Sequence, residues 1–283
     1  MKTRIVLTVT LGAALAGCGG SASTPGRTVV ASFYPLAFAA EQIAGPGTDV
    51  RNLTPPGVEP HDLELSGSDV RTIADAKLVL YLGESFQPSL EDAIDSTSAH
   101  AVDLLDTVAT RAGQHEHAVD PHVWLDPIRY AAIAVRIGKE LDRTSAANRF
   151  AAKLHALDHE LGRGLSDCER KEIVTSHAAF GYLAARYELK QVAITSIAPE
   201  AEPTPRDLEQ VVRQVRAVGA TTVFFETLVS PRLAETVARE VGAHTAVLDP
   251  VEGLTDAQAA AGEDYFSVMR QNLAALREAL GCR

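Results

Sequence analysis

Two histidines and one aspartate of this chain stand where apolar, β-branched runs end. His61 follows "DVRNL", His177 closes "EIVTSH" and Asp249 closes "TAVLD". The fourth residue, His122, lies in the proline-bracketed segment "DPHVWLDP". Imidazole nitrogens and a carboxylate oxygen together suit a four-coordinate cation such as Zn²⁺, whereas Ca²⁺ and Mg²⁺ sites consist mostly of oxygens. We therefore expect a zinc site if these four segments meet in space.

The elements that must position these residues alternate along the chain from Thr28. Amphipathic stretches separate seven short apolar runs: "TVVASF", "DVRNL", "KLVLYL", "EIVTSH", "QVAITS", "TVFFET" and "TAVLD". This alternation predicts an α/β fold with parallel sheets that helices cover on both faces. Because open parallel sheets bind ligands beyond the carboxyl ends of their strands, the expected ligands stand in suitable loops.

Two helix starts and one long helix can be read from the pattern. Ser66 or Ser68 is expected to cap a helix that runs toward Ala76, and Thr204-Pro205 is expected to begin another. In the middle of the chain, apolar residues recur at helical spacing on one face: Phe150, Leu154, Leu157, Leu161 and Leu165. A helix from residue 148 to 165 would be ~27 Å long.

The long helix suggests how the chain is divided. We expect an N-terminal α/β lobe at residues 28–145, a linking helix at 146–167 and a C-terminal α/β lobe at 168–283. On the pattern alone, a surface helix within one domain remains the alternative.

The amino terminus has the features of an export signal. Basic "MKTR" precedes the apolar run Ile5–Ala16, which is too short to span a bilayer but suits a secretory signal. The run ends in "LAGC", so Cys18 is the expected lipidation site, and residues 19–27 read as a flexible tether. We expect an exported protein that a lipid holds on the outer side of a membrane, in a periplasm or at a cell surface. An ordinary signal peptide with an incidental cysteine is the alternative.

Charge and cysteine usage limit the partners and the compartment. The net charge of −11, with 37 acidic and 26 basic residues, argues against nucleic-acid binding. Apart from Cys18 the chain contains only Cys168 and Cys282. In an oxidising compartment we expect a disulfide between these two, with two free thiols as the alternative.

Longer motifs carry a resemblance to a known family. "GVEPHDLELSGSDV", "DPHVWLDP", "TSHAAFGYLAARY", "PEAEPTPRDL" and "FFETLVSPRLAETVAREVGAHTAVLDPVEG" occur in this order. They resemble the metal-binding, solute-binding lipoproteins of ABC transporters, and most closely the zinc-uptake, ZnuA/TroA-like type. The resemblance implies two α/β lobes bridged by one rigid helix. It also implies a non-enzymatic, monomeric receptor that delivers Zn²⁺ to an ABC permease.

The same resemblance assigns the ligands. His61, His122 and His177 match the three histidine ligands, and Asp249 matches the terminal carboxylate. Manganese-type members have glutamate at the position of His177, so histidine there implies zinc. In zinc-type members a water or a nearby glutamate can take the fourth place. Glu59 and Glu226 are the local candidates, although we expect both to support the ligands instead.

Some histidines and functions remain outside this assignment. Many zinc-type relatives carry a long histidine-rich loop, which here is the short "GQHEHAVD". His115 and His117 would either recruit zinc or belong to a plain polar loop. His155 and His159 stand four residues apart on the long helix, and we expect surface residues rather than a metal site. Trp124 is expected to pack beside the site.

Three alternative functions remain open. The chain could be a manganese or other divalent-metal carrier of the same family, or an adhesin. A zinc hydrolase, in which three histidines activate a water, is the third alternative. The chain contains no H-E-x-x-H segment, and Asp249 would close the site to water.

Overall fold

The computed structural model describes residues 28–113, 119–197, 199 and 203–283. The expected lipidation site Cys18 and the loop histidines His115 and His117 lie outside the described residues. Within the described part of the chain, no helix is both long enough and apolar enough to cross a membrane.

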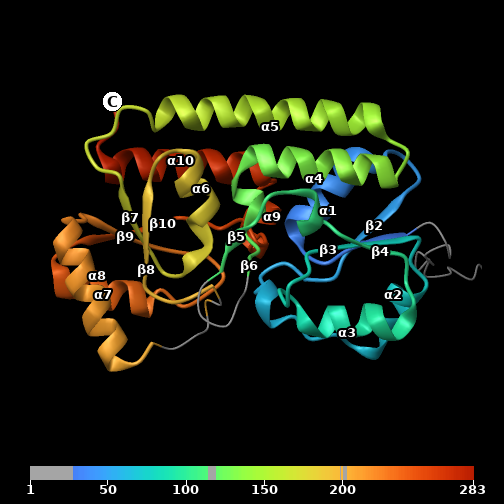
Figure 1. The fold of residues 1–283 in the computed structure, drawn as a ribbon, viewed down its shortest axis with the longest axis horizontal. Helices are drawn as coiled ribbons and strands as arrows, with labels where there is room; N and C mark the ends of the chain where they lie inside the picture. The colour runs from blue at the N-terminus through green and yellow to red at the C-terminus, as the bar shows by residue number, and fades with distance from the viewer. Residues whose placement is uncertain (1–27, 114–118, 198, 200–202) are drawn as a thin grey trace, which may run out of the picture.

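The N-terminal lobe contains a four-stranded parallel sheet in the order β2-β1-β3-β4. Helices cover both of its faces, with α1 and α4 on one side and α2 and α3 on the other (Figure 1). The strands are β1 (Thr28–Ala31), β2 (Asp49–Asn52), β3 (Leu78–Tyr81) and β4 (Ala101–Asp103). The helices are α1 (Tyr34–Ala44), α2 (Gly67–Ala74), α3 (Pro88–Thr97) and α4 (Pro127–Glu140).

The C-terminal lobe repeats this plan with the parallel strand order β10-β9-β7-β8. Helices α7 and α8 pack on one side through valines such as Val211 and Val237, and α10 lies on the other (Figure 1). The strands are β7 (Glu172–Thr175), β8 (Lys190–Ala193), β9 (Thr222–Phe225) and β10 (His244–Val247). The helices are α6 (Gly181–Arg186), α7 (Pro205–Val218), α8 (Arg232–Val241), α9 (Asp256–Ala260) and α10 (Tyr265–Leu280).

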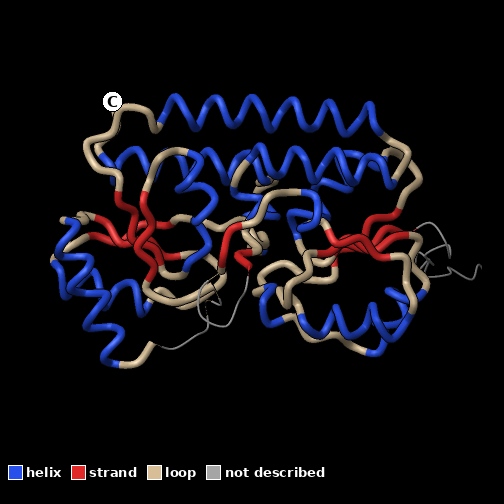
Figure 2. Tube along the Cα trace, viewed as in Figure 1, coloured by secondary structure: helices blue, strands red, loops and turns tan. Residues whose placement is uncertain are grey.

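Helix α5 (Thr144–Gly164) is the predicted long helix, and it extends along both lobes above α4 and α10 (Figures 1 and 2). The predicted apolar face is buried, with Leu154, Leu157 and Leu161 completely inaccessible. These residues belong to one apolar core that continues from α1 and α4 into α10. Asp158 on α5 accepts two hydrogen bonds from the Arg186 guanidinium, at 2.8 and 2.7 Å, which holds the helix to α6. The fold is thus two α/β lobes joined by one long helix.

Local signals for secondary structure were mostly correct. All seven predicted runs form strands, and Ser66 and Thr204 cap α2 and α7 as expected, each in a reciprocal capping box. The sequence pattern missed β4 and the two-residue antiparallel pair β5 (Arg111–Ala112) and β6 (Val119–Asp120). Each of these strands has at most one fully buried residue, so none produces an apolar run.

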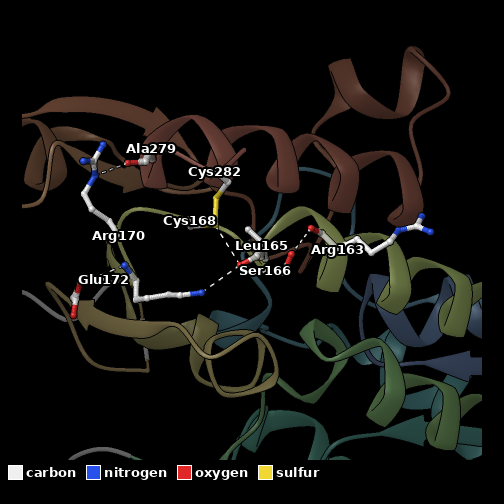
Figure 3. Close-up of a disulfide and its surroundings, with 9 residues drawn as sticks. Arg163, Leu165, Ser166, Cys168, Arg170, Glu172, Ala279 and Cys282 are labelled. Carbon is white, nitrogen blue, oxygen red and sulfur yellow. Dashed lines mark hydrogen bonds between the residues drawn. A yellow bond between two sulfur atoms is a disulfide. The ribbon is translucent and has the colours of Figure 1, made fainter.

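The structure joins Cys168 and Cys282 in a disulfide (Figure 3). This bond connects the segment after α5 with the second residue after α10, across a sequence separation of 114. Backbone hydrogen bonds flank it: Arg170 donates to Leu280 and Arg283 donates to Asp167. The disulfide therefore anchors the end of the chain to the beginning of the C-terminal lobe.

Candidate metal centre

Four ligand-type side chains converge between the lobes: His61, His122, His177 and Glu252. One ligand atom from each lies within 4.8 Å of the others, and these residues form the one such group among those described. His61 follows β2 in η1 (Pro60–Asp62), and His122 follows β6 and precedes η3 (Val123–Leu125). His177 follows β7 and precedes η4 (Ala178–Phe180), and Glu252 follows β10. The three predicted histidines therefore meet, as the strand-end argument anticipated.

His61 is positioned by a short 3₁₀ turn that begins at Pro60. The Glu59 carboxylate accepts the backbone N–H of His61 at 3.0 Å and so caps this turn. The imidazole packs edge-on against Phe86, with ring centroids 4.7 Å apart. These contacts aim the ring into the space between the lobes. Glu59 thus supports His61, in the role that the sequence suggested.

His122 is completely buried, and the Asp120 carboxylate binds its Nδ1 atom. Asp120 accepts both the backbone N–H of His122, at 3.0 Å, and a hydrogen bond from Nδ1, at 2.8 Å. With Nδ1 donating to Asp120, the neutral ring presents its Nε2 lone pair for metal binding, on the side where Glu252 Oε1 lies 3.0 Å away. Trp124 packs near this ring and donates from Nε1 to Pro250 O at 2.7 Å. The predicted packing residue therefore also connects the two lobes.

His177 has the same arrangement in the other lobe. Its Nδ1 lies 2.7 Å from Glu226 Oε1, which also accepts the Ser176 hydroxyl at 2.7 Å. Glu226 is buried at the end of β9, the strand next to β7. Glu226 therefore orients His177 and is engaged on that side of the ring.

Glu252 is the acidic member of the group, and sequence reasoning missed it. Its Oε1 lies 3.0 Å from His122 Nε2, 3.5 Å from His177 Nε2 and 3.7 Å from His61 Nε2. Four ligands at zinc bond lengths of 2.0–2.1 Å in a tetrahedron would be about 3.3 Å apart. The three distances from Glu252 Oε1 to the imidazole nitrogens lie around this value.

Asp249, the predicted fourth ligand, is not part of this group. Its carboxylate accepts hydrogen bonds from the Thr227 hydroxyl at 2.9 Å, from Gln258 Nε2 at 3.0 Å and from the Val251 N–H at 2.7 Å. These bonds engage both carboxylate oxygens with residues of the C-terminal lobe. A second carboxylate stands three positions later in "LDPVEG", and this one, Glu252, belongs to the group.

Buried atoms without partners mark the interior of the site. The Nε2 atoms of His61 and His177 and the Oε2 atom of Glu252 are inaccessible and make no hydrogen bond. Buried polar atoms are normally paired, so such a cluster calls for a ligand that bonds to all of them at once. Nitrogen and oxygen lone pairs arranged around one point fit a cation.

The pKa values of the titratable side chains in the site differ from those of isolated side chains. Burial lowers the pKa of His61, whereas nearby carboxylates overcome the effect of burial and raise the pKa of His122 and of His177. The three imidazoles hold the pKa of Glu252 well below its usual value, although burial alone would raise it. Burial and the charge of Glu252 raise the pKa of Glu59 to about 10. Without metal, the site therefore pairs one carboxylate with partly protonated imidazoles.

Known proteins are similar to this chain in both sequence and fold. Residues 29–279 match the family model described as zinc-uptake complex component A, periplasmic. The high-affinity zinc uptake system protein ZnuA of Bacillus subtilis is 34% identical, with 94% of this chain and 93% of that protein covered. The zinc-binding lipoprotein AdcA of Streptococcus pneumoniae is 36% identical over 93% of this chain. This chain spans little more than half of AdcA, 58% of its length.

Solved structures agree with this relationship. One of them is the laminin-binding protein Lmb of Streptococcus agalactiae, described as an adhesin with metal-transporting activity. It superposes on this chain with a TM-score of 0.81 at 30% identity, and the superposition covers 90% of this chain and all of that one. Zn(II)-bound AdcA from S. pneumoniae gives a TM-score of 0.77 at 35% identity, with 89% of this chain and 57% of that one covered. Sequence and structure together show that the chain belongs to the family of zinc-uptake complex component A proteins.

Proposed function

We propose that this protein is an extracytoplasmic receptor that captures Zn²⁺ between its lobes and delivers it to an ABC permease. The observation that carries this proposal is the convergence of three imidazole Nε2 atoms on Glu252, with the Nδ1 atoms of two rings held by buried carboxylates. Capture replaces the water around the ion with His61, His122, His177 and Glu252. Three nitrogens and one oxygen favour zinc over the harder manganese ion.

The site suits binding better than hydrolysis. A hydrolytic zinc site keeps an open position for water and a nearby group that can accept its proton. Here Glu252 takes the fourth position, Glu226 is bonded to His177 and Ser176, and Glu59 caps the turn at His61. This arrangement supports a carrier of zinc rather than a catalyst.

We further propose the export and anchoring that the amino terminus suggests. Cys18 would carry the lipid, residues 19–27 would tether the lobes, and the receptor would act as a monomer beside its permease. Two or more acyl chains would hold it stably on the membrane. The name of AdcA as a zinc-binding lipoprotein supports this arrangement.

The function is tested by metal titration of the purified, metal-free full chain. We expect one tightly bound zinc ion per chain and displacement of manganese by zinc in competition. Failure to bind one zinc per chain, or a preference for manganese, would overturn the proposal.

Zinc affinity is expected to fall with decreasing pH. Because the pKa values of His122 and His177 are raised above the usual 6.5, protons compete with zinc at a higher pH than for ordinary histidines. Each proton displaced by the metal should weaken affinity about tenfold per pH unit below the raised pKa. Zinc titrations between pH about 8 and about 6, in buffers of different ionisation enthalpy, measure both the slope and the protons released. An affinity that stays constant over this range would contradict the expectation.

A further inference from the structure

The turn that carries Glu252 has an unusual backbone at Val251. Val251 has φ +57°, and it is the one β-branched residue among the six non-glycine residues with positive φ in the described part of the chain. A β-branched side chain is strongly disfavoured in this left-handed region. Val251 is also completely buried and directly precedes Glu252. Such strain persists only where the surrounding structure imposes it, and it is often found at ligand sites.

Hydrogen bonds of Asp249 help to hold Val251 in this conformation. Its Oδ1 accepts the N–H of Val251 at 2.7 Å, and its Oδ2 accepts Thr227 and Gln258. The backbone of Asp249 is fixed as well, because the Asn272 side chain accepts its N–H at 2.9 Å and donates to its carbonyl at 2.6 Å. Asp249 therefore connects the turn with the loop after β9 and with α9 and α10.

The N-terminal lobe holds the turn on both sides of Glu252. Before Glu252, Trp124 Nε1 donates to the Pro250 carbonyl at 2.7 Å. After Glu252, Gly57 donates its N–H to the Leu254 carbonyl at 2.9 Å, from the loop that leads to His61. A Cβ atom at Gly253 would make ordinary van der Waals contact with Leu228, at 3.4 Å, and with the Val58 carbonyl, at 3.7 Å, so the turn also lies against the loop that leads to His61.

We propose that the strained turn at Val251, with Asp249 as its positioning residue, presets Glu252 as the fourth ligand and thereby determines zinc affinity and selectivity. A carboxylate on a relaxed turn could shift outward and admit a larger ion or extra water. The fixed turn instead keeps Oε1 at the distances from the imidazoles that four-coordinate zinc requires. This inference rests on the proposed zinc function and assigns a role to Asp249 other than metal binding.

The test compares V251G and D249N with the wild-type full chain. Glycine reaches positive φ without strain but is equally free to leave it, and it lacks the buried valine side chain, so the turn is no longer held in one conformation. Asparagine keeps the size of Asp249 but cannot accept all of its hydrogen bonds. Both variants should bind zinc about 10- to 100-fold more weakly, as is usual when a group that orients a ligand is lost. Both should also discriminate less between zinc and manganese. Bound Co²⁺ should show weaker visible absorption, because its coordination departs from four ligands.

E188G is the matched control, since Glu188 also has positive φ, at 56°, but is exposed and lies between α6 and β8. It should leave zinc affinity and the Co²⁺ spectrum unchanged. If V251G loses its fold because its buried side chain is missing, D249N still decides the question. Wild-type zinc affinity, selectivity and Co²⁺ spectrum in the folded variants would overturn the inference. So would an E252Q variant that binds zinc like the wild type. If the wild-type chain binds no zinc, the proposed function itself fails.

Discussion

Replacement of His122 with alanine is expected to lower zinc affinity about 100-fold or more. Structural zinc sites contribute about 10–16 kcal/mol in total, which is about 3 kcal/mol for each of four ligands. Of the three histidines in the proposed site, His122 lies closest to Glu252, at 3.0 Å, and its Nδ1 partner Asp120 is also buried. The substitution would therefore remove a proposed ligand and leave the buried carboxylates of Asp120 and Glu252 without their His122 partner. Competition with a chelator of known zinc affinity measures the loss.

H244A provides the control for this substitution. His244 is an exposed residue at the start of β10, outside the group of four ligands. Its replacement should not change zinc affinity. A D120A variant should fall between the two, about 10- to 100-fold weaker than wild type, because it removes the partner of Nδ1 and not the ligand. If H122A binds zinc as tightly as H244A does, His122 is not a ligand.

Removal of the disulfide is expected to reduce the free energy of unfolding by about 2–5 kcal/mol. The Cys168–Cys282 bond closes a long loop, with a sequence separation of 114, and so restricts the unfolded chain strongly. In a protein of this size the loss corresponds to a decrease in Tm of roughly 5–15 °C. Thermal unfolding of the C168S/C282S variant, monitored by circular dichroism, measures it.

Reduction of the wild-type chain is the companion measurement. It should produce about the same decrease in Tm, whereas the double variant should not respond to reductant. Zinc affinity well below Tm should stay unchanged, because the disulfide follows the C-terminal end of α10 (Figure 3), whereas Glu252 precedes α9, before the start of α10. Equal Tm values for the wild-type chain and the double variant would show that the bond does not stabilise the fold.

The architecture was predictable because its signals are local. Parallel strands buried on both faces produce continuous apolar runs, and the buried face of α5 repeats at helical spacing. Capping by Ser66 and Thr204 depends on residues only three positions away. The strands that escaped prediction, such as β4, are short and partly exposed, so they leave no local pattern.

The candidate site was predictable only in part. His61 and His177 follow predicted strands and His122 stands in a segment bracketed by prolines, so all three were candidates from the sequence pattern, and the resemblance to zinc-uptake receptors assigned them as ligands. The supporting roles of Glu59 and Glu226 are also present, as a turn cap at His61 and as the partner of His177 Nδ1. The role of Asp120 could not be read from its sequence position, because it depends on the rotation of the His122 ring.

The sequence by itself determined the two parallel sheets, the long helix between them and the three histidines that stand at one place in the fold. Only the tertiary structure decided between Asp249 and Glu252. Both carboxylates follow the last strand, three residues apart, and composition does not distinguish them. The positive φ of Val251 turns the chain so that Asp249 bonds to its own lobe and Glu252 faces the imidazoles. That conformation depends on contacts with Trp124, Asn272 and Gly57, which are distant in the sequence, so local patterns could not reveal it.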